Sequence, residues 1–152
     1  MRILGVDTAS EPAARGYAIV DSGRLAWFGK RPPPAEAGPI DVVAGERPWT
    51  AAGKLRGEAL ITFAVNNGFQ LRDAWPHGAP LFVELKVRDW KNLVFPGRAT
   101  MQGDAFCMNI RQKFAPHVAD TDILDAIGIA VAASRLSLAQ LKKLQQKGFR
   151  RT

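Results

Sequence analysis

Cysteine is almost absent: Cys107 is the only one among the 152 residues. An internal disulfide is impossible, so the chain is not a disulfide-stapled scaffold. Long apolar runs are also missing, since the longest, residues 126–133, is far shorter than the roughly 20 residues of a membrane-spanning helix. Residues 1–7 reach a carboxylate before a signal-peptide segment can develop. We therefore expect a protein of the reducing cytoplasm with no membrane segment.

Acidic residues are outnumbered, with 14 Asp and Glu against 21 Lys and Arg, which gives a net charge of +7. The isoelectric point is near 10.1. Polyanions such as nucleic acids are the partners that this balance favours. Residues 135–152 contain six basic residues and no acidic one. This segment either binds a polyanion or is an ordinary solvated surface.

The composition is that of a folded globular protein, with 47% hydrophobic and 23% charged residues. These values exclude disordered and collagen-like chains. The length suits a single domain. We expect residues 1–134 to form its body and residues 135–152 to form a basic C-terminal helix and tail of the same domain.

Three short apolar segments at residues 2–6, 14–20 and 24–29 predict strands. The tight-turn sequence at residues 21–23 makes the second and third antiparallel neighbours, so the chain opens with a three-stranded meander. Five of the ten prolines fall within residues 30–49. Because proline disrupts helices and central strands, this segment is predicted to be a long loop.

The remaining segments alternate between helix and strand patterns. Helical spacing of apolar residues predicts helices over residues 50–67, 100–114, 121–134 and 137–148, and an apolar run predicts a buried strand over residues 81–87. Gly68 is expected to end the first of these helices, and Asp120 or Thr121 to cap the third. Residues 88–99 are expected to be irregular. The predicted fold class is α/β, a mixed sheet that opens with an antiparallel meander and is flanked by helices.

Four carboxylates lie within apolar segments, where ionised groups are rare unless they are paired or bind a cation. They are Asp7, Glu84, Asp122 and Asp125. Each of the first three has a plain structural alternative: a turn cap, an ion pair with a basic residue, or a favourable place at a helix N-terminus. Asp125 lies a turn into an apolar helix, on the same face as Asp122, and is harder to explain in this way.

A common site would bring these carboxylates together, and their charges would then repel one another unless divalent cations neutralised them. Carboxylate oxygens suit Mg²⁺ or Mn²⁺. Two such ions, about 3.5–4 Å apart, are the usual arrangement for phosphodiester hydrolysis. The sequence therefore predicts a two-metal site at Asp7, Glu84, Asp122 and Asp125.

The order of these segments resembles that of the ribonuclease H-like nucleases and, within them, the RuvC family of Holliday junction resolvases. The resemblance rests on residues 3–7, on the strand at residues 16–20, on Glu84 within its apolar strand and on the aspartate helix at residues 122–126. A weaker match, residues 97–100, places Arg98 near DNA phosphates. Thr8-Ala9-Ser10 stands where the family commonly has proline and glycine. Such departures fit a divergent member, for example one encoded by a phage.

The resemblance implies a metal-dependent endonuclease that cleaves four-way or branched DNA as a homodimer. Six basic residues would contact phosphates: Lys86, Arg88, Lys91, Arg98, Lys142 and Lys143. Other readings are a ribonuclease H activity on hybrids and a non-catalytic junction-binding protein. The actin and sugar-kinase superfamily shares an opening strand with aspartate, but it needs two such domains, which the length does not allow.

Several other residues leave two interpretations open. His117 precedes the aspartate helix and either assists proton transfer or is a surface residue. Trp27 and Trp90 can stack on unpaired bases, although packing is the better expectation for both. Cys107 is expected to pack rather than react. The leucines of the final helix form either a dimer contact or a contact with the body of the domain.

Overall fold

The computed structural model describes residues 1–47 and 58–146, and of residues 58–63 the backbone alone. The strands are β1 Arg2–Asp7, β2 Gly16–Asp21, β3 Arg24–Gly29, β4 Val42–Glu46 and β5 Leu81–Leu85. The helices are α1 Glu58–Ala74, α2 Val87–Val94, α3 Gly103–Phe114, α4 Thr121–Ser134 and α5 Leu138–Lys143, with short 3₁₀ turns at Pro12–Ala14 and Ala35–Ala37. No helix in the described ranges has the length and apolar character that crossing a bilayer requires.

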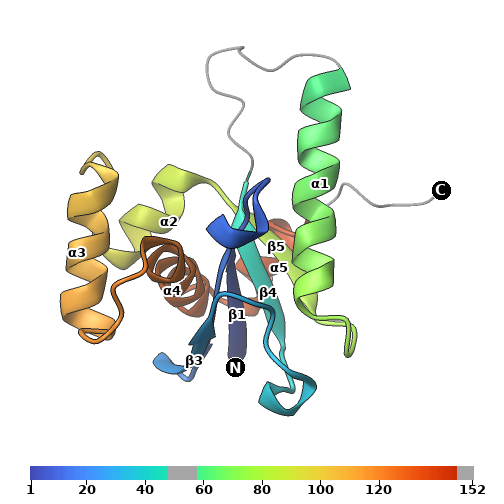
Figure 1. The fold of residues 1–152 in the computed structure, drawn as a ribbon, viewed down its shortest axis with the longest axis horizontal. Coiled ribbons are helices and arrows are strands. Elements are labelled where there is room, and N and C mark those ends of the chain that lie inside the picture. The colour runs from blue at the N-terminus through green and yellow to red at the C-terminus, as the bar shows by residue number, and fades with distance from the viewer. Residues whose placement is uncertain (48–57, 147–152) are drawn as a thin grey trace.

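The five strands form one mixed sheet in the order β3-β2-β1-β4-β5. The first three are antiparallel, and β4 and β5 run parallel to β1. Helix α1 covers one face of the sheet, and α2, α3 and α4 lie on the other (Figure 1). The predicted fold class, including the opening meander, is confirmed.

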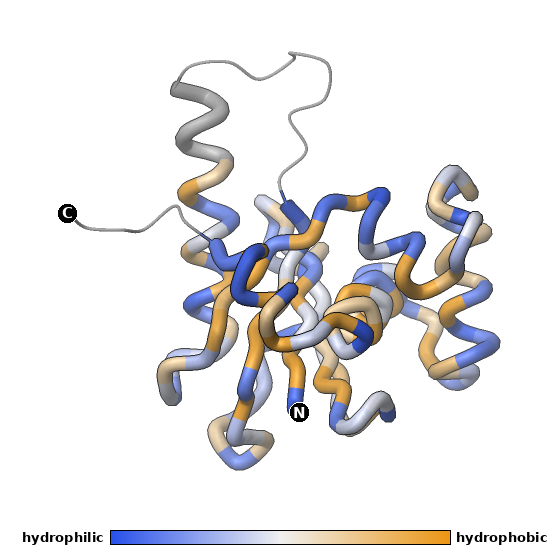
Figure 2. The backbone as a smooth tube through the Cα atoms, turned by 180° about the vertical axis from the view of Figure 1, so that it is seen from behind, coloured by the Kyte–Doolittle hydropathy of each residue, from blue (hydrophilic) through white to orange (hydrophobic). Residues whose placement is uncertain are grey.

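Alternation along the strands divides the apolar core between the two faces. In β1, Ile3 belongs to the cluster under α2, α3 and α4, whereas Leu4 belongs to the cluster under α1. Figure 2 shows hydrophobic residues along the strands and along the helices packed on them. Helix α4 is buried on nearly all sides, as its apolar sequence predicts, and ten of its residues are buried.

Two glycines let the backbone of α4 rest directly on the sheet. A Cβ atom at Gly5 would lie 2.1 Å from the carbonyl oxygen of Ala126, and one at Gly16 would lie 2.2 Å from that of Asp122. Both distances are impossible for real atoms, and both neighbours are backbone. The absence of side chains at these positions therefore fixes the height of α4 above β1 and β2.

We expect Gly5→Ala to destabilise the protein by about 3 kcal/mol or more, because backbone must move to admit the methyl group. The matched control is Gly103→Ala at the start of α3, where an added Cβ meets nothing within 4 Å. That change should stay within about 0.5 kcal/mol. Urea unfolding measures both. Equal midpoints for the two variants would contradict the close packing of α4 on β1.

The prediction of a loop over residues 30–49 is wrong in part, because Val42–Glu46 forms β4, an interior strand of the sheet. Prolines lie before and after this segment and none lies within it, so they bound the strand instead of breaking it. Residues 88–99, predicted to be irregular, contain most of α2, and β5 ends at Leu85 instead of Val87.

Helix boundaries differ from the predicted ones where tertiary packing outweighs local signals. Helix α1 continues through Gly68 to Ala74, because the roughly 1 kcal/mol cost of a helical glycine is offset by burial of Leu71 and Ala74. The predicted start of this helix, residues 50–57, lies outside the described residues. Helix α3 begins at Gly103 instead of Thr100. The predicted cap of α4 by Asp120 is confirmed.

Helix α5 begins with the predicted capping box of Ser137 and Gln140. It ends at Lys143, and the predicted continuation from Lys147 onward lies outside the described residues. Leu141 is fully buried, and the amide of Gln146 donates to the carbonyl of Phe82 at 2.8 Å. Helix α5 and the residues after it therefore pack along β5.

Candidate active site

The neighbouring parallel strands β1 and β4 each end in a carboxylate at the same edge of the sheet. Val6 pairs with Gly45, so the next residues along the two strands, Asp7 and Glu46, lie side by side. The residues before them, Val6 and Gly45, face α1. Because successive side chains of a strand point to opposite faces of the sheet, Asp7 and Glu46 point toward α4. The structure thus adds Glu46 to the carboxylates that the sequence singled out.

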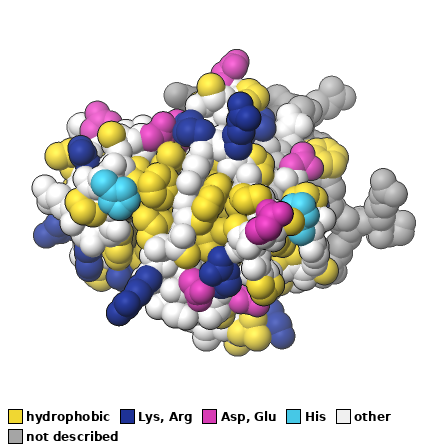
Figure 3. Space-filling view, turned by 60° about the horizontal axis from the view of Figure 1, so that its bottom comes forward, with side chains coloured by type: hydrophobic (Ala, Val, Ile, Leu, Met, Phe, Trp, Pro, Cys, Tyr) yellow, Lys and Arg dark blue, Asp and Glu magenta, His cyan; other side chains and the backbone are white. Residues whose placement is uncertain are grey.

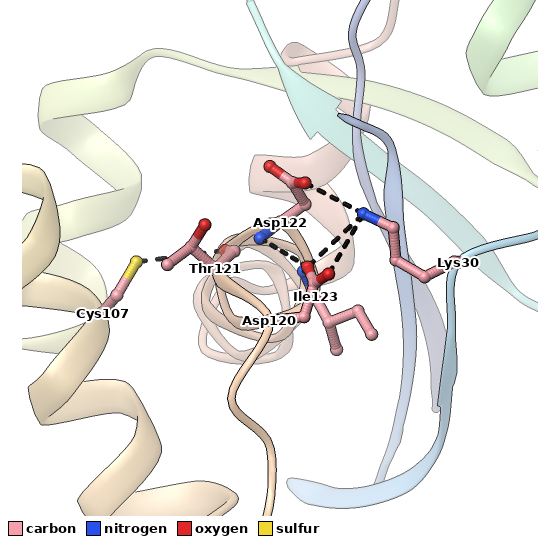
Figure 4. A network of polar contacts seen from close by, with 6 residues as sticks. All are labelled: Lys30, Cys107, Asp120, Thr121, Asp122 and Ile123. Carbon is pink, nitrogen blue, oxygen red and sulfur yellow. Dashed lines mark hydrogen bonds and ion pairs between the residues drawn. The ribbon is translucent and has the colours of Figure 1, made fainter. Parts of the chain in front are cut away.

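Helix α4 supplies two more carboxylates to the same place. The Asp120 side chain caps the helix by accepting from the amides of Asp122 at 2.9 Å and Ile123 at 3.1 Å (Figure 4). This cap fixes the first turn, and Asp122 and Asp125, three residues apart, share one helix face. Direct contact between α4 and β2 at Gly16 sets that turn against the sheet.

The four carboxylates lie close enough for their charges to interact. Burial raises the pKa of Asp7 to about 8, and the charges of Asp125, Asp122 and Glu46 contribute to the rise. Burial is also the main cause of the raised pKa of Glu46 and of Asp125. Raised pKa values from burial and like charges are typical of functional sites.

Three of the four carboxylates are held by different hydrogen-bond donors. Lys30, just after β3, donates to Asp122 at 2.9 Å and forms an ion pair with Asp120 at 3.3 Å. The Cys107 thiol of α3 donates to Asp125 at 3.3 Å. The indole of Trp90 in α2 donates to Glu46 at 3.2 Å. These donors come from three separate parts of the chain.

The hydrogen bonds of these carboxylates affect whether they can bind a metal ion. Within residues 1–47 and 58–146, no three Asp, Glu, His or Cys side chains converge closely enough to hold an ion in this conformation. The donor set, four carboxylates that repel one another, nevertheless has the chemistry that Mg²⁺ and Mn²⁺ prefer. Binding would require side chains such as Asp122 and Asp125 to turn from their present partners.

The structure does not bring Glu84 to this cluster, which corrects its predicted place. In β5, Val83 and Leu85 face α4, so Glu84 faces α1. There it accepts a hydrogen bond from the Asn67 amide at 2.9 Å, and burial raises its pKa. Glu46 takes the position expected of Glu84. The missed signal was the apolar run Val42–Ala44, which leads to a carboxylate just as residues 3–6 lead to Asp7.

The predicted DNA-binding residues fall into separate groups. Lys91 in α2 lies nearest the cluster, because its charge lowers the pKa of Glu46 and of Asp125. Its ammonium also lies over the Phe106 ring, 5.1 Å from the centroid. The others are Lys86 and Arg88 at the start of α2, Arg98 after the turn that follows α2, and Lys142 and Lys143 on α5.

Trp90 and Cys107 pack as the sequence suggested, although both also contact the acidic cluster. Trp90 is only 1% exposed and its ring meets Phe106 edge to face. Cys107 is 5% exposed, and burial together with the nearby Asp125 raises its pKa to about 12. Trp90 is therefore a core residue, not an open stacking platform.

We expect the Cys107 thiol to resist alkylation at pH 8 in the folded protein, because thiolate is the reactive form and almost none is present. Thiol labelling followed by mass measurement tests this. In denaturant the same thiol should label rapidly, which is the control. Rapid labelling of the folded chain would contradict the placement of Cys107 beside Asp125.

Comparisons with known proteins relate the chain to others through its fold. No family model and no curated protein sequence matches it. The structure of Thermus thermophilus RuvC in complex with a Holliday junction substrate is similar, with a TM-score of 0.58 and 14% identity over 95% of this chain and 98% of that one. A second Thermus thermophilus RuvC structure gives a TM-score of 0.56 and 13% identity over 95% and 99% of the two chains. The chain thus has a RuvC-like fold of the ribonuclease H-like class.

Proposed function

We propose that this chain is a metal-dependent endonuclease that cleaves four-way or branched DNA. The observation that carries the proposal is the cluster of Asp7, Glu46, Asp122 and Asp125 at one edge of a RuvC-like sheet. Burying like charges together is costly, and a fold retains such an arrangement when function needs it. The four residues are proposed to hold two Mg²⁺ or Mn²⁺ ions.

The scaffold gives each carboxylate a rigid support. Asp7 and Glu46 are fixed by the pairing of β1 with β4, and Asp122 and Asp125 by a helix whose first turn is capped and pressed against the sheet. Ions bound there would supply an activated water and stabilisation of the leaving oxygen. Partial burial of Asp7, Glu46 and Asp125 lowers the local dielectric constant, which strengthens their attraction for cations.

Basic residues are proposed to position the phosphate backbone. Lys91 places a positive charge beside the cluster, where the scissile phosphate would lie. Lys86 and Arg88 lie at the start of the same helix and Arg98 lies after it, whereas Lys142 and Lys143 lie on α5. Such contacts give affinity without reading sequence. The RuvC neighbour that was solved with a Holliday junction supports branched DNA as substrate, and we propose that the chain acts as a homodimer.

Cleavage of a labelled four-way junction is expected in Mg²⁺ or Mn²⁺ and should stop in chelator, because the carboxylates alone cannot activate water. Calcium should permit binding without efficient cutting, since it coordinates more loosely. Gel assays on the junction, a linear duplex and an RNA–DNA hybrid of equal length measure this. Metal-independent cutting would contradict the proposed site, and preferred cutting of the hybrid would assign a ribonuclease H activity instead.

A further inference from the structure

A second feature, separate from the acidic cluster, is a groove of about 700 Å³ between β3 and the C-terminal end of α3. Its volume is in the range of pockets that bind ligands. Among the described residues that line it there is no Asp or Glu, whereas Arg24, Lys113 and His117 are all present. Figure 3 looks toward the end of the molecule that carries β3 and shows apolar side chains at the centre, with basic, histidine and acidic side chains around them.

The two cations of the groove are available to a ligand. In the described part of the chain neither Arg24 nor Lys113 forms an ion pair, and Arg24 is exposed. The Lys113 ammonium lies against aromatic rings, 5.5 Å from the centroid of Phe114 and 5.6 Å from that of Phe95. A groove with two such cations and no acid favours a polyanion.

Aromatic side chains line the same groove. Phe28 is 37% exposed although it is large and apolar, and it lies on β3, the edge strand of the sheet. The His117 ring lies beside it, with centroids 5.7 Å apart and planes at 52°. Phe114 completes the aromatic lining. Rings interleaved with cations are the combination that holds unpaired nucleic acid, with bases against rings and phosphates against cations.

One end of the groove adjoins the acidic cluster. Phe28 lies two residues before Lys30, and His117 lies three residues before Asp120. The pair Lys30 and Asp120, 3.3 Å apart, thus joins the two sides of the groove at the N-terminus of α4. A strand in the groove would therefore lead to the carboxylates.

We propose that the groove between β3 and α3 binds a single strand of nucleic acid, with phosphates at Arg24 and Lys113 and an unpaired base on Phe28. This goes beyond the junction cleavage proposed above, because it assigns a strand-binding site that needs no metal ion. A protein segment is a less suitable occupant, since it would have to be strongly acidic and would leave the rings without a matching partner.

The charge part of the proposal is tested with a short fluorescent oligothymidylate in chelator, where cleavage cannot interfere. Arg24→Gln/Lys113→Gln should weaken binding and lower the slope of log affinity against log salt by about 0.7 for each phosphate that the protein no longer neutralises. The matched control Arg24→Lys/Lys113→Arg keeps both charges and should keep the slope. Thermal unfolding confirms that both variants are folded.

The stacking part is tested with Phe28→Ala, which should weaken oligothymidylate binding roughly 5-fold or more. Phe28→Tyr keeps a ring and should bind as the unaltered protein does. A duplex of the same length, whose bases are already paired, should bind equally to all three proteins. A general loss of folding would instead lower the affinity for both probes.

Separate outcomes distinguish failure of this proposal from failure of the nuclease proposal. If the protein cuts junctions but does not bind oligothymidylate, or binds it with an unchanged slope in the glutamine variant, the groove proposal is overturned and the nuclease proposal stands. If it binds oligothymidylate through these residues but cuts no nucleic acid with any metal, the groove proposal stands alone.

Discussion

Asp7→Asn is expected to make the protein more stable near pH 8, by an amount on the order of 5 kcal/mol, when no divalent ion is present. The folded-state pKa of Asp7 is about 8, against 3.8 for an unperturbed carboxyl. Stability linked to this proton is fully present below about pH 3.8 and is lost as pH rises to 8. The amide of the Asp7→Asn variant has no such proton to lose. The difference in free energy of unfolding between the variant and the unaltered chain should therefore grow with pH.

Urea unfolding at pH 5 and pH 8 measures this advantage as the difference between the variant and the unaltered chain. The difference isolates Asp7 from Glu46 and Asp125, whose pKa values are also raised. Asp104→Asn, an exposed carboxylate in the first turn of α3, controls for the loss of one charge and should change stability by about 0.5 kcal/mol or less. A difference that does not depend on pH would show that Asp7 is well solvated.

Local sequence patterns were sufficient to predict most of the residues of the candidate site. Asp7 ends an apolar strand, and the short polar segment before a strongly apolar helix located the Asp120 cap and the pair Asp122 and Asp125. Each of these inferences depends on residues within one turn or one strand. The order of the predicted elements indicated the fold class, because a meander followed by helices and strands has few compact arrangements, but it lacked β4 and α2.

Glu46 and Glu84 were confused because their difference is a matter of sheet register. Both β4 and β5 are covered on their two faces, so neither strand shows the polar and apolar alternation that would reveal which face a carboxylate joins. The pairing of β4 with β5 decides which face each carboxylate joins. Gly45 pairs with Glu84 and both face α1, so Glu46, the next residue, faces α4. The contact of Lys30 with Asp122, 92 residues apart, was equally beyond local patterns.

Glu46→Gln is expected to reduce junction cleavage by more than about 100-fold, whereas Glu84→Gln should remain within a few-fold of the unaltered protein. Even residues that only support metal ligands are worth roughly 10- to 100-fold, so a ligand itself should be worth more. The two changes are closely matched. Each is isosteric, and each leaves an amide oxygen to accept the existing bond, from Trp90 at position 46 and from Asn67 at position 84.

The central claim is that the catalytic carboxylates gather on the α4 face of the sheet with Glu46 among them. The initial rate of Mg²⁺-dependent cleavage of a four-way junction, compared side by side for Glu46→Gln and Glu84→Gln, tests it most directly. Thermal unfolding of both variants provides the control for folding. Loss of cleavage in Glu46→Gln with near-normal cleavage in Glu84→Gln is the predicted result. Normal cleavage in Glu46→Gln with loss in Glu84→Gln would contradict the account and place the site on the α1 face.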